Sequence, residues 1–375
     1  MPNPDAKRPH LIIAAGGTGG HMFPAQALAQ EALRQGWRVT LSTDARGARY
    51  AGGFPPEVAR REVRAATFAR GGMLAKALAP VSIVAGIVQT ALWFLRDRPA
   101  VVAGFGGYPS LPALAAAVLT GVPRLIHEQN GVLGRVNRAF SRRVAAVACG
   151  TWPLTRPPEG AHLVRMGNPV RDAALAAAQI PYAPPGEGPL HLLAFGGSQG
   201  ASVLADMVPA AVALLPDDIR ARLHVTQQAR EGERAQVRAA YDAMGVPADI
   251  APFFADMPGL IASAQVVIAR AGASTIAELT VIGRPAILVP YPSAMDDHQT
   301  ANAAPLADAG AAIVTPESGP DPLTAALLSG HLREIFSDPA RAASMAAAAR
   351  SLGRPDAAAA LVALAKNVAT RSAAP

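Results

Sequence analysis

Short apolar runs alternate with longer amphipathic stretches along most of the chain. Residues 11–15 are all apolar, a glycine-rich segment follows, and residues 23–35 carry apolar positions at helical spacing. A short apolar run bounded by turn residues is typical of a buried strand, and the spacing after it predicts an amphipathic helix. The same signals predict further strands at 39–43, 100–103, 124–126, 192–195, 222–226, 250–254, 265–269 and 285–290, and helices at 111–119, 232–244 and 340–371, the last broken at 353–355.

Strands that alternate with helices form parallel sheets, so the pattern predicts an α/β fold. The 375 residues are too many for one typical domain and suit two. The glycine-rich loop at 16–20 has a counterpart at 196–200, again between a strand and a helix, which predicts two similar domains. A Pro- and Gly-rich stretch at 181–189 places the hinge within 168–189. We therefore predict an N-terminal domain over 1–170 and a C-terminal domain over 171–352.

The charge distribution and the cysteine content indicate what kind of partner the chain could bind and whether disulfides stabilise it. Residues 1–170 carry a net charge of +12 and residues 171–375 a net charge of −5. A basic first half favours an anionic partner such as a phosphorylated substrate, a nucleic acid or an anionic lipid surface, although solvated arginine-rich faces would give the same balance. The single cysteine, Cys149, lies in an apolar run, so no disulfide forms within the chain and a buried structural role is favoured. No secretory signal peptide is visible.

Four glycine or polar segments follow predicted strands, where open parallel sheets bind ligands. Beside the loop at 196–200 already described, they lie at residues 16–21, 104–110, 127–130 and 272–278. The first invites a dinucleotide interpretation, with Asp44 at the end of the second strand. That interpretation is disfavoured because Met22 stands where the third glycine of the fingerprint belongs.

Residues 272–278 are the most specific segment of the second half. Small residues, Ser274 and Thr275 open a predicted helix whose N–H groups could hold a diphosphate, and Glu278 lies one turn further on, within reach of a ribose. The same residues could instead serve as helix caps, with Glu278 facing the helix dipole. No hydrolytic triad, H-E-x-x-H motif or paired cysteine ligands occur, so we predict no bound metal and no cofactor.

The stretch 77–95 carries no charge and is long enough to span a membrane. Spanning would put the strands at 11–15 and 100–103 on opposite sides of the bilayer, so we favour a helix packed on the sheet. With arginines around it, its exposed part could rest on an anionic membrane surface, and an ordinary core helix with an arginine rim is the alternative. The expected patch comprises Leu74, Lys76, Leu78, Trp93 and Arg96, with Phe94 also near water.

Seven motifs occur in a fixed order. They are 16–21 with Pro24, 106–108, 127–130, 167–171, 196–200, 270–273, and 298–299 with Asn302. In this combination the chain resembles the MurG family over roughly residues 10–365. The resemblance implies two Rossmann-like domains of the GT-B type, with parallel sheets facing across a cleft and the C-terminal helix, 353–375, packing back on the N-terminal domain. The N-terminal domain would then take the acceptor and face the membrane, and the C-terminal domain would bind the UDP-sugar donor.

The resemblance also implies an activity: inverting transfer of N-acetylglucosamine from UDP-N-acetylglucosamine to the muramyl 4-hydroxyl of lipid I. Lipid I is undecaprenyl-pyrophosphoryl-MurNAc-pentapeptide, and the product is lipid II of peptidoglycan synthesis. The implied partners are these two substrates and an anionic membrane surface, with no nucleic acid, and the implied location is the cytoplasmic face of the cell membrane, as a peripheral protein. By motif, the donor would be held by Thr18, Gly19, Gly20, Asn130, Arg171, Ser198, Phe254, Ala273, Ser274, Thr275, Ile276, Ala277, Glu278 and Gln299.

An inverting transfer needs a general base for the incoming hydroxyl and a positive environment for the departing UDP. His21 is the first candidate base because it lies at a helix start beside the first glycine loop and titrates near neutral pH. Glu128 is the second. Alternatively, His21 only caps its helix or binds phosphate. Two other functions compete: a different GT-B enzyme or UDP-sugar epimerase, and a basic nucleic-acid-binding protein, for which the 5% aromatic content is low.

Overall fold

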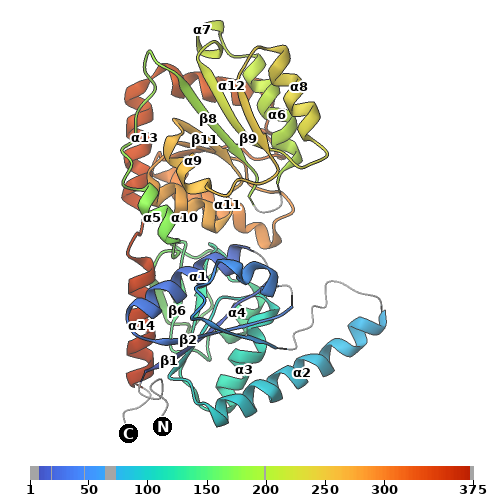
Figure 1. The fold of residues 1–375 in the computed structure, drawn as a ribbon, viewed down its shortest axis with the longest axis vertical. Coiled ribbons are helices and arrows are strands. Elements are labelled where there is room, and N and C mark those ends of the chain that lie inside the picture. The colour runs from blue at the N-terminus through green and yellow to red at the C-terminus, as the bar shows by residue number, and fades with distance from the viewer. Residues whose placement is uncertain (1–7, 18, 46, 64–72, 198–199, 372–375) are drawn as a thin grey trace. The chain divides into compact units, whose positions relative to one another are not determined.

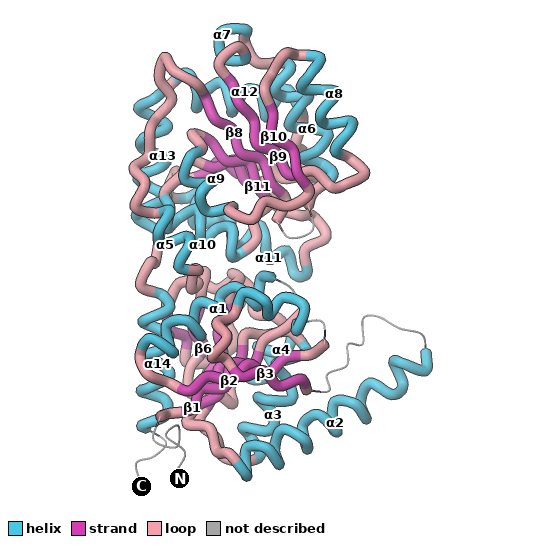
Figure 2. The backbone as a smooth tube through the Cα atoms, in the orientation of Figure 1, coloured by secondary structure: helices cyan, strands magenta, loops and turns pink. Residues whose placement is uncertain are grey.

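The computed structural model describes residues 8–17, 19–45, 47–63, 73–197 and 200–371, without the side chains of residue 50 and residues 73–79. The chain forms two compact units. Unit 1 comprises Met1–Arg171 and Pro355–Pro375, and unit 2 comprises Asp172–Arg354. Each unit is built around its own parallel sheet with helices packed on it (Figures 1 and 2).

The described part of unit 1 contains a seven-stranded sheet in the order β3-β2-β1-β4-β5-β6-β7, in which every pairing is parallel. Its strands are β1 His10–Ala14, β2 Arg38–Thr43, β3 Ala59–Glu62, β4 Val101–Gly104, β5 Arg124–Glu128, β6 Val147–Cys149 and β7 Leu163–Arg165. The central strands β1 and β4 are buried along their whole length, as expected for strands covered on both faces.

The helices of unit 1 cover both faces of this sheet. They are α1 Gly19–Arg34, α2 Met73–Arg96, α3 Leu111–Leu119, α4 Arg135–Phe140 and α14 Ala357–Arg371, with 3₁₀ segments at Gly47–Gly53 and Tyr108–Ser110. Because side chains alternate along a strand, Leu11 and Ile13 of β1 pack with α1 and α14, whereas Ile12 packs with α2 and α3. The last helix of the chain thus completes the core of the first unit.

The described part of unit 2 contains a six-stranded parallel sheet in the order β10-β9-β8-β11-β12-β13. Its strands are β8 Leu190–Phe195, β9 Leu223–Gln228, β10 Ala248–Ala251, β11 Val266–Ala269, β12 Ala286–Leu288 and β13 Ala312–Val314. Its helices are α5 Asp172–Ala177, α6 Ser202–Ala213, α7 Asp217–Arg220, α8 Arg234–Ala243, α9 Met257–Ser263, α10 Ala273–Ile282, α11 His298–Asp308, α12 Ala325–Ser337 and α13 Pro339–Leu352, with a 3₁₀ turn at Met295–Asp297. Residues of α6, α8 and α12 form one continuous core with alternate positions of β8.

Several helices and strands begin or end at residues other than those predicted. Helix α1 begins at Gly19 rather than at residue 23, so Pro24 lies inside the helix and cannot donate the i+4 hydrogen bond to Gly20 O. The strand predicted over 250–254 is instead Ala248–Ala251 and ends before Pro252. The long C-terminal helix is divided at the predicted break into α13 and α14. Among the described residues, no helix combines the length and the apolar character needed to cross a membrane.

Candidate functional site

Two glycine loops meet at the carboxyl edge of the unit 1 sheet, beside His21. One loop follows β1 and the other follows β4, its neighbour in the sheet. Their approach leaves no room for side chains: a Cβ on Gly16 would lie 2.7 Å from the Pro109 ring, and one on Gly107 would lie 3.4 Å from Gly16 O. That same position on Gly107 is 3.7 Å from His21 Cε1. The half-buried His21 side chain, in the first turn of α1, therefore lies next to the loop after β4.

The Glu128 carboxylate organises the segment that follows β5. It is buried and accepts hydrogen bonds from Asn130 N and Nδ2 (both 3.1 Å), from Gly134 N (2.9 Å) and from Asn137 Nδ2 (2.9 Å). Burial raises the pKa of Glu128, and the four donated hydrogen bonds oppose that rise. Since both oxygens accept from local donors, the geometry fits a carboxylate that holds residues 129–137 in shape.

Other buried polar side chains gather at the same edge. His127 Nε2 donates to Gly167 O at 3.1 Å, which ties β5 to the segment after β7. Within the described ranges, four buried side chains here keep polar atoms without a hydrogen-bond partner: His127 Nδ1, Gln129 Oε1, Asn137 Oδ1, and both amide atoms of Asn168. Buried polar atoms are normally hydrogen-bonded. This edge of unit 1 therefore suits a ligand rich in hydroxyl and amide groups.

Arg171 brings a positive charge to the same region. Its guanidinium carbon lies 4.5 Å from the centroid of the Phe23 ring in α1, which is within the range of a cation–π contact. The segment that follows β7 thus reaches the first turns of α1. The contact holds Arg171 near the helix that carries His21.

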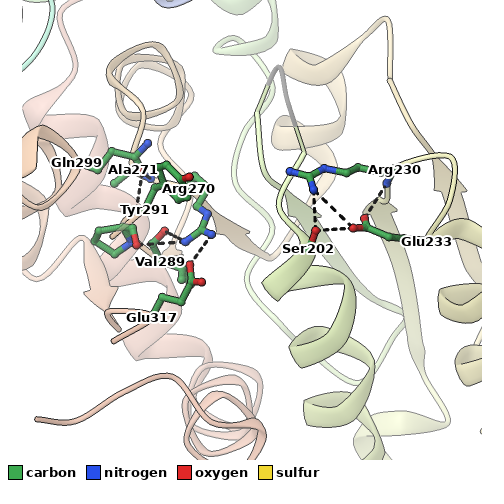
Figure 3. A network of polar contacts seen from close by, with 10 residues as sticks. Ser202, Arg230, Glu233, Arg270, Ala271, Val289, Tyr291, Gln299 and Glu317 are labelled. Atoms are coloured by element: carbon green, nitrogen blue, oxygen red, sulfur yellow. Dashed lines mark hydrogen bonds and ion pairs between the residues drawn. The ribbon is translucent and has the colours of Figure 1, made fainter. Parts of the chain in front are cut away.

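Unit 2 contains a cavity of about 360 Å³, within the size range of small-ligand sites. It opens at the carboxyl edge of the sheet, because its walls come from the segments after β8, β9, β11, β12 and β13 and from the start of α11. The lining residues are Gly196, Gly200, Ala201, Ser202, Val203, Arg230, Arg270, Tyr291, Gln299 and Glu317. Figure 3 shows most of these polar side chains in two groups.

Gln299 connects two walls of this cavity. Its Oε1 accepts hydrogen bonds from Ala271 N (3.1 Å) and Tyr291 N (3.0 Å), which are drawn in Figure 3. Two backbone donors at the oxygen fix the orientation of the amide, so the NH₂ group is the end that a ligand would meet. Asn302, one turn later in α11, donates to Ala271 O at 3.0 Å and secures the same segment.

Figure 3 shows Arg270 in one group with Tyr291, Gln299 and Glu317, and Arg270 is the cation of that group. It is buried, donates to Val289 O (3.2 Å) and Pro290 O (3.1 Å), and pairs with Glu317 at 2.5 Å. Its guanidinium carbon also lies 5.2 Å from the centroid of the Tyr291 ring. A buried arginine needs such partners, and these hold its charge at the cavity wall.

The start of α10 differs from the capped helix that the sequence suggested. Gly272 is the N-cap residue and makes no side-chain cap hydrogen bond, so Ser274 and Thr275 lie inside the first turn. Ser274 Oγ is buried without a hydrogen-bond partner among the described residues, and Glu278 is buried one turn further on. The N-cap interpretation of Ser274 and Thr275 is therefore wrong, because the N-cap position belongs to Gly272, which has no side chain.

Two protein-family models match the chain. The glycosyltransferase family 28 N-terminal domain matches residues 11–149, and the glycosyltransferase family 28 C-terminal domain matches residues 191–361. The two matched segments follow the two structural units closely.

Curated relatives match nearly the whole chain. A protein of Chelativorans sp. (strain BNC1) is 49% identical over 348 residues, which cover 92% of this chain and 92% of its own. It is named UDP-N-acetylglucosamine--N-acetylmuramyl-(pentapeptide) pyrophosphoryl-undecaprenol N-acetylglucosamine transferase, as is a Brucella abortus (strain S19) protein that is 48% identical over 361 residues, 96% of this chain and 94% of its own. The chain belongs to the MurG family.

A solved structure agrees with this assignment. The crystal structure of Acinetobacter baumannii MurG is similar with a TM-score of 0.76 and 30% identity, over 96% of this chain and 99% of that one. A Listeria monocytogenes structure titled "putative UDP-N-acetylglucosamine 2-epimerase" has a TM-score of 0.67 at 14% identity, which shows a shared fold alone. MurG-family membership confirms the predicted α/β fold of GT-B type and the prediction that the chain is a glycosyltransferase.

Of the donor residues implied by resemblance to the MurG family, Gln299 lines the unit 2 cavity. The run from Ala273 to Glu278 follows Ala271, whose backbone N–H bonds to Gln299. Phe254, half-buried in the segment after β10, is not among the residues that line the cavity. Thr18 and Ser198 lie outside the described residues, and Gly19, Gly20, Asn130 and Arg171 belong to unit 1.

The predicted membrane patch needs a correction. Trp93 is 6% exposed and Phe94 is fully buried, because both pack into the core between α2, α3 and the sheet. Trp93 also lies under the Arg61 guanidinium, 4.5 Å from the ring centroid. Arg96 is exposed, as expected, and the side chains of Leu74, Lys76 and Leu78 lie outside the description.

The exposed apolar side chains of α2 lie on another face of the helix. They are Val81 (66%), Val84 (58%), Val88 (51%), Leu92 (48%) and Leu95 (67%). Steps of three or four residues place them on one side of a helix. We call this set the α2 stripe. In Figure 1, α2 packs beside α3 at its C-terminal part and extends away from the sheet at its N-terminal part.

Sequence reasoning missed several polar side chains of both units. Asn137 and Asn168 at the unit 1 edge, and Arg230, Glu233 and Glu317 near the unit 2 cavity, were not among the candidates. Arg230 lies two residues after β9, at the sheet edge where ligands bind, so position relative to a strand end was a usable signal. Glu317 had no such signal, because its pairing with Arg270 joins residues far apart in the sequence.

Proposed function

We propose that this chain transfers N-acetylglucosamine from UDP-N-acetylglucosamine to the muramyl 4-hydroxyl of lipid I, giving lipid II. The observation that carries the proposal is the near 50% identity, over almost the full length, to relatives named for this transfer. The polar edge of unit 1 and the arginine-lined cavity of unit 2 provide sites for two polar substrates.

Unit 2 binds the donor in this proposal. The diphosphate lies against Gly196 and Gly200 after β8 and against the start of α10, where backbone N–H groups and the helix dipole favour negative charge. Gln299 presents its NH₂ group to hydroxyl or phosphate oxygens. Glu278, buried in α10, accepts from the ribose hydroxyls.

Unit 1 binds the acceptor and supplies the general base. The 4-hydroxyl oxygen attacks C1 of N-acetylglucosamine, the bond from C1 to the β-phosphate oxygen breaks, and its electron pair leaves with UDP. His21 takes the hydroxyl proton, and a single displacement inverts the configuration at C1. We assign this role to His21 rather than Glu128, because both Glu128 oxygens already accept local hydrogen bonds.

The lipid-linked acceptor requires access to a membrane surface. We infer that the α2 stripe enters the interface of an anionic leaflet, with the exposed Arg96 and Arg98 near lipid headgroups. The chain then works as a peripheral protein at the cytoplasmic face of the cell membrane, where UDP-N-acetylglucosamine is available. This arrangement also accounts for the basic charge of the first half.

The reaction is tested with radiolabelled UDP-N-acetylglucosamine and a lipid I analogue. We expect label to enter the lipid fraction only when both substrates are present, with one UDP released for each transfer. Omitting the donor and the acceptor in turn provides the controls. Release of UDP at the same rate without the acceptor would reject the transfer and favour a hydrolysing epimerase.

A further inference from the structure

We propose that Arg230 binds the diphosphate of the nucleotide donor, from a different wall of the unit 2 cavity than Arg270. The inference rests on the proposed function and adds a residue that the family motifs did not supply. Arg230 and Arg270 both line the cavity. In Figure 3 they belong to separate groups, and the Arg230 guanidinium points toward the group that contains Arg270.

The sheet order places Arg230 beside the glycine segment. β9 pairs with β8, so the segments that follow these strands are neighbours at the carboxyl edge. A Cβ on Gly200 would lie 3.1 Å from Arg230 Cγ and 3.4 Å from its Nε. Arg230 Nη1 donates to Ser202 Oγ, at the first residue of α6, at 2.7 Å. The guanidinium is therefore held where a phosphate bound by Gly200 and the start of α6 would lie.

Glu233 holds Arg230 and Ser202 in this arrangement through two hydrogen bonds. Its Oε2 accepts from Arg230 N at 3.1 Å, and its Oε1 accepts from Ser202 Oγ at 2.5 Å. Arg230 Nη1 is 3.9 Å from the same Oε1. The three side chains form the second group in Figure 3, which joins the end of β9 to the start of α6. Glu233 is thus a positioning residue, and Arg230 is the member that reaches the cavity.

The two arginines differ in what they can offer a ligand. Arg270 is buried, and Glu317 and two backbone carbonyls hold its guanidinium. The Arg230 side chain is 52% exposed at the cavity wall, where it donates to Ser202 Oγ and pairs with Glu233 at 3.9 Å. A planar guanidinium matches the oxygen geometry of phosphate and forms bidentate hydrogen bonds with it. Arg230 is therefore the better-placed cation for an incoming diphosphate.

The test compares two ligands on the full chain. Dissociation constants for UDP and for uridine are measured by calorimetry for wild type, Arg230→Gln and Arg230→Lys. Arg234→Gln is the matched control, because Arg234 is a partly exposed arginine one turn further on that pairs with Glu231 instead. The ratio of the two constants isolates what the diphosphate contributes to binding.

We expect Arg230→Gln to weaken UDP binding by about 10-fold to 100-fold and to leave uridine binding unchanged. Arg230→Lys keeps the charge but not the planar fork, so its loss is smaller, and this variant serves if the glutamine variant does not fold. Arg234→Gln keeps the wild-type ratio. An unchanged ratio in Arg230→Gln, or an equal loss for both ligands, would overturn the inference while the transferase proposal stands. Failure of the wild-type chain to bind UDP would instead reject the proposed function.

Discussion

His21 is the side chain on which the proposed proton transfer depends. It lies in the first turn of α1 beside the loop after β4, where a reacting hydroxyl could approach. We predict that His21→Ala lowers kcat by about 10²-fold to 10⁴-fold, the usual contribution of a general base, and leaves the dissociation constant for UDP-N-acetylglucosamine near the wild-type value. Steady-state kinetics and donor titration give the two quantities.

The matched control for this prediction is His162→Ala, which removes an exposed histidine of the same unit. It should keep the wild-type kcat. A His21→Ala variant that turns over at a near-normal rate would remove His21 from the role of base. A variant with normal kcat at saturation and weak substrate binding would identify it as a binding residue.

His127 makes the stability of unit 1 depend on pH. It is fully buried, and burial lowers its pKa from 6.5 to about 4. Because the folded pKa lies below the unfolded one, the neutral histidine stabilises the fold above pH 6.5, and this contribution is lost as the pH falls toward 4. The loss amounts to about 3 kcal/mol. Urea unfolding of wild type between pH 7.5 and pH 4 measures it.

The variant His127→Gln should show a shallower fall of stability over the same pH range, whatever its stability at neutral pH. Part of the slope remains, because burial also lowers the pKa of His10 to about 4. His162→Gln serves as the surface control. A slope in His127→Gln equal to that of wild type would assign the pH dependence to other groups.

For single residues, the sequence identified some of the candidate site residues but not which residues they contact. Gln299 and residues 273–278 could be named from motifs, because their chemistry depends on local spacing. The contacts of Arg230 with Ser202 and of Arg270 with Glu317 span 28 and 47 positions, and only the sheet order brings them together. The buried amides of Asn137 and Asn168 could not be foreseen, since burial of one polar residue leaves no periodic signal.

Among the elements, α2 shows how an apolar pattern can mislead. The helix is apolar on nearly every side, so the sequence could not say which side meets the core. The large rings of Trp93 and Phe94 fill the space against α3 and the sheet, and the smaller Val81, Val84 and Val88 remain outside. Gly86 and Thr90 are also buried while the larger Leu92 and Leu95 stay exposed, so contacts with α3 and the sheet, rather than the hydropathy of α2, selected the buried face.

The α2 stripe should carry membrane binding. We predict that Val84→Asp combined with Val88→Asp abolishes flotation with vesicles that contain anionic lipid, because a charge in the acyl boundary is costly. Leu214→Asp is the matched control, since Leu214 lies in unit 2 and is 58% exposed, the same as Val84. Flotation of the double variant at the wild-type level would reject the stripe as the membrane contact.

The strands show the opposite behaviour. Central strands such as β1, β8 and β11 were predictable, because strands covered on both faces read as continuous apolar runs. The edge strand β3 escaped prediction, since all four of its residues are exposed and include Arg60, Arg61 and Glu62. This segment is a strand because it pairs with β2, and the hydrophobic pattern of residues 59–62 alone does not reveal that pairing.

In the whole molecule, helix α14 follows unit 2 in the sequence but belongs to the core of unit 1. Helix α14 packs against α1, β4 and β5, and its residues Leu361 and Val362 are fully buried in the unit 1 core. Residues 172–354, which precede it, form unit 2. The unit 2 core therefore ends before residue 355, and the helix that follows completes the unit 1 core.

This division predicts separate effects of two matched substitutions on thermal unfolding. Leu361→Ala should lower the unfolding temperature of unit 1 by about 5–10 °C, and Leu332→Ala should do the same to unit 2, because both leucines are fully buried. Calorimetry of each variant resolves the transitions. If Leu361→Ala shifted the transition of unit 2 as much as that of unit 1, the assignment of α14 to the unit 1 core would be contradicted.

The position of α14 also bears on how the protein is made. During synthesis, residues 172–354 leave the ribosome as one uninterrupted segment and hold everything that the unit 2 sheet requires. The earlier segment of unit 1 waits for α14, which is translated after the whole of unit 2, before the face formed by Leu11, Ile13 and α1 is covered. The unit 1 segment that precedes residue 172 therefore exposes an apolar surface until unit 2 has been translated, and this segment is the one that chaperones or a membrane would need to shield.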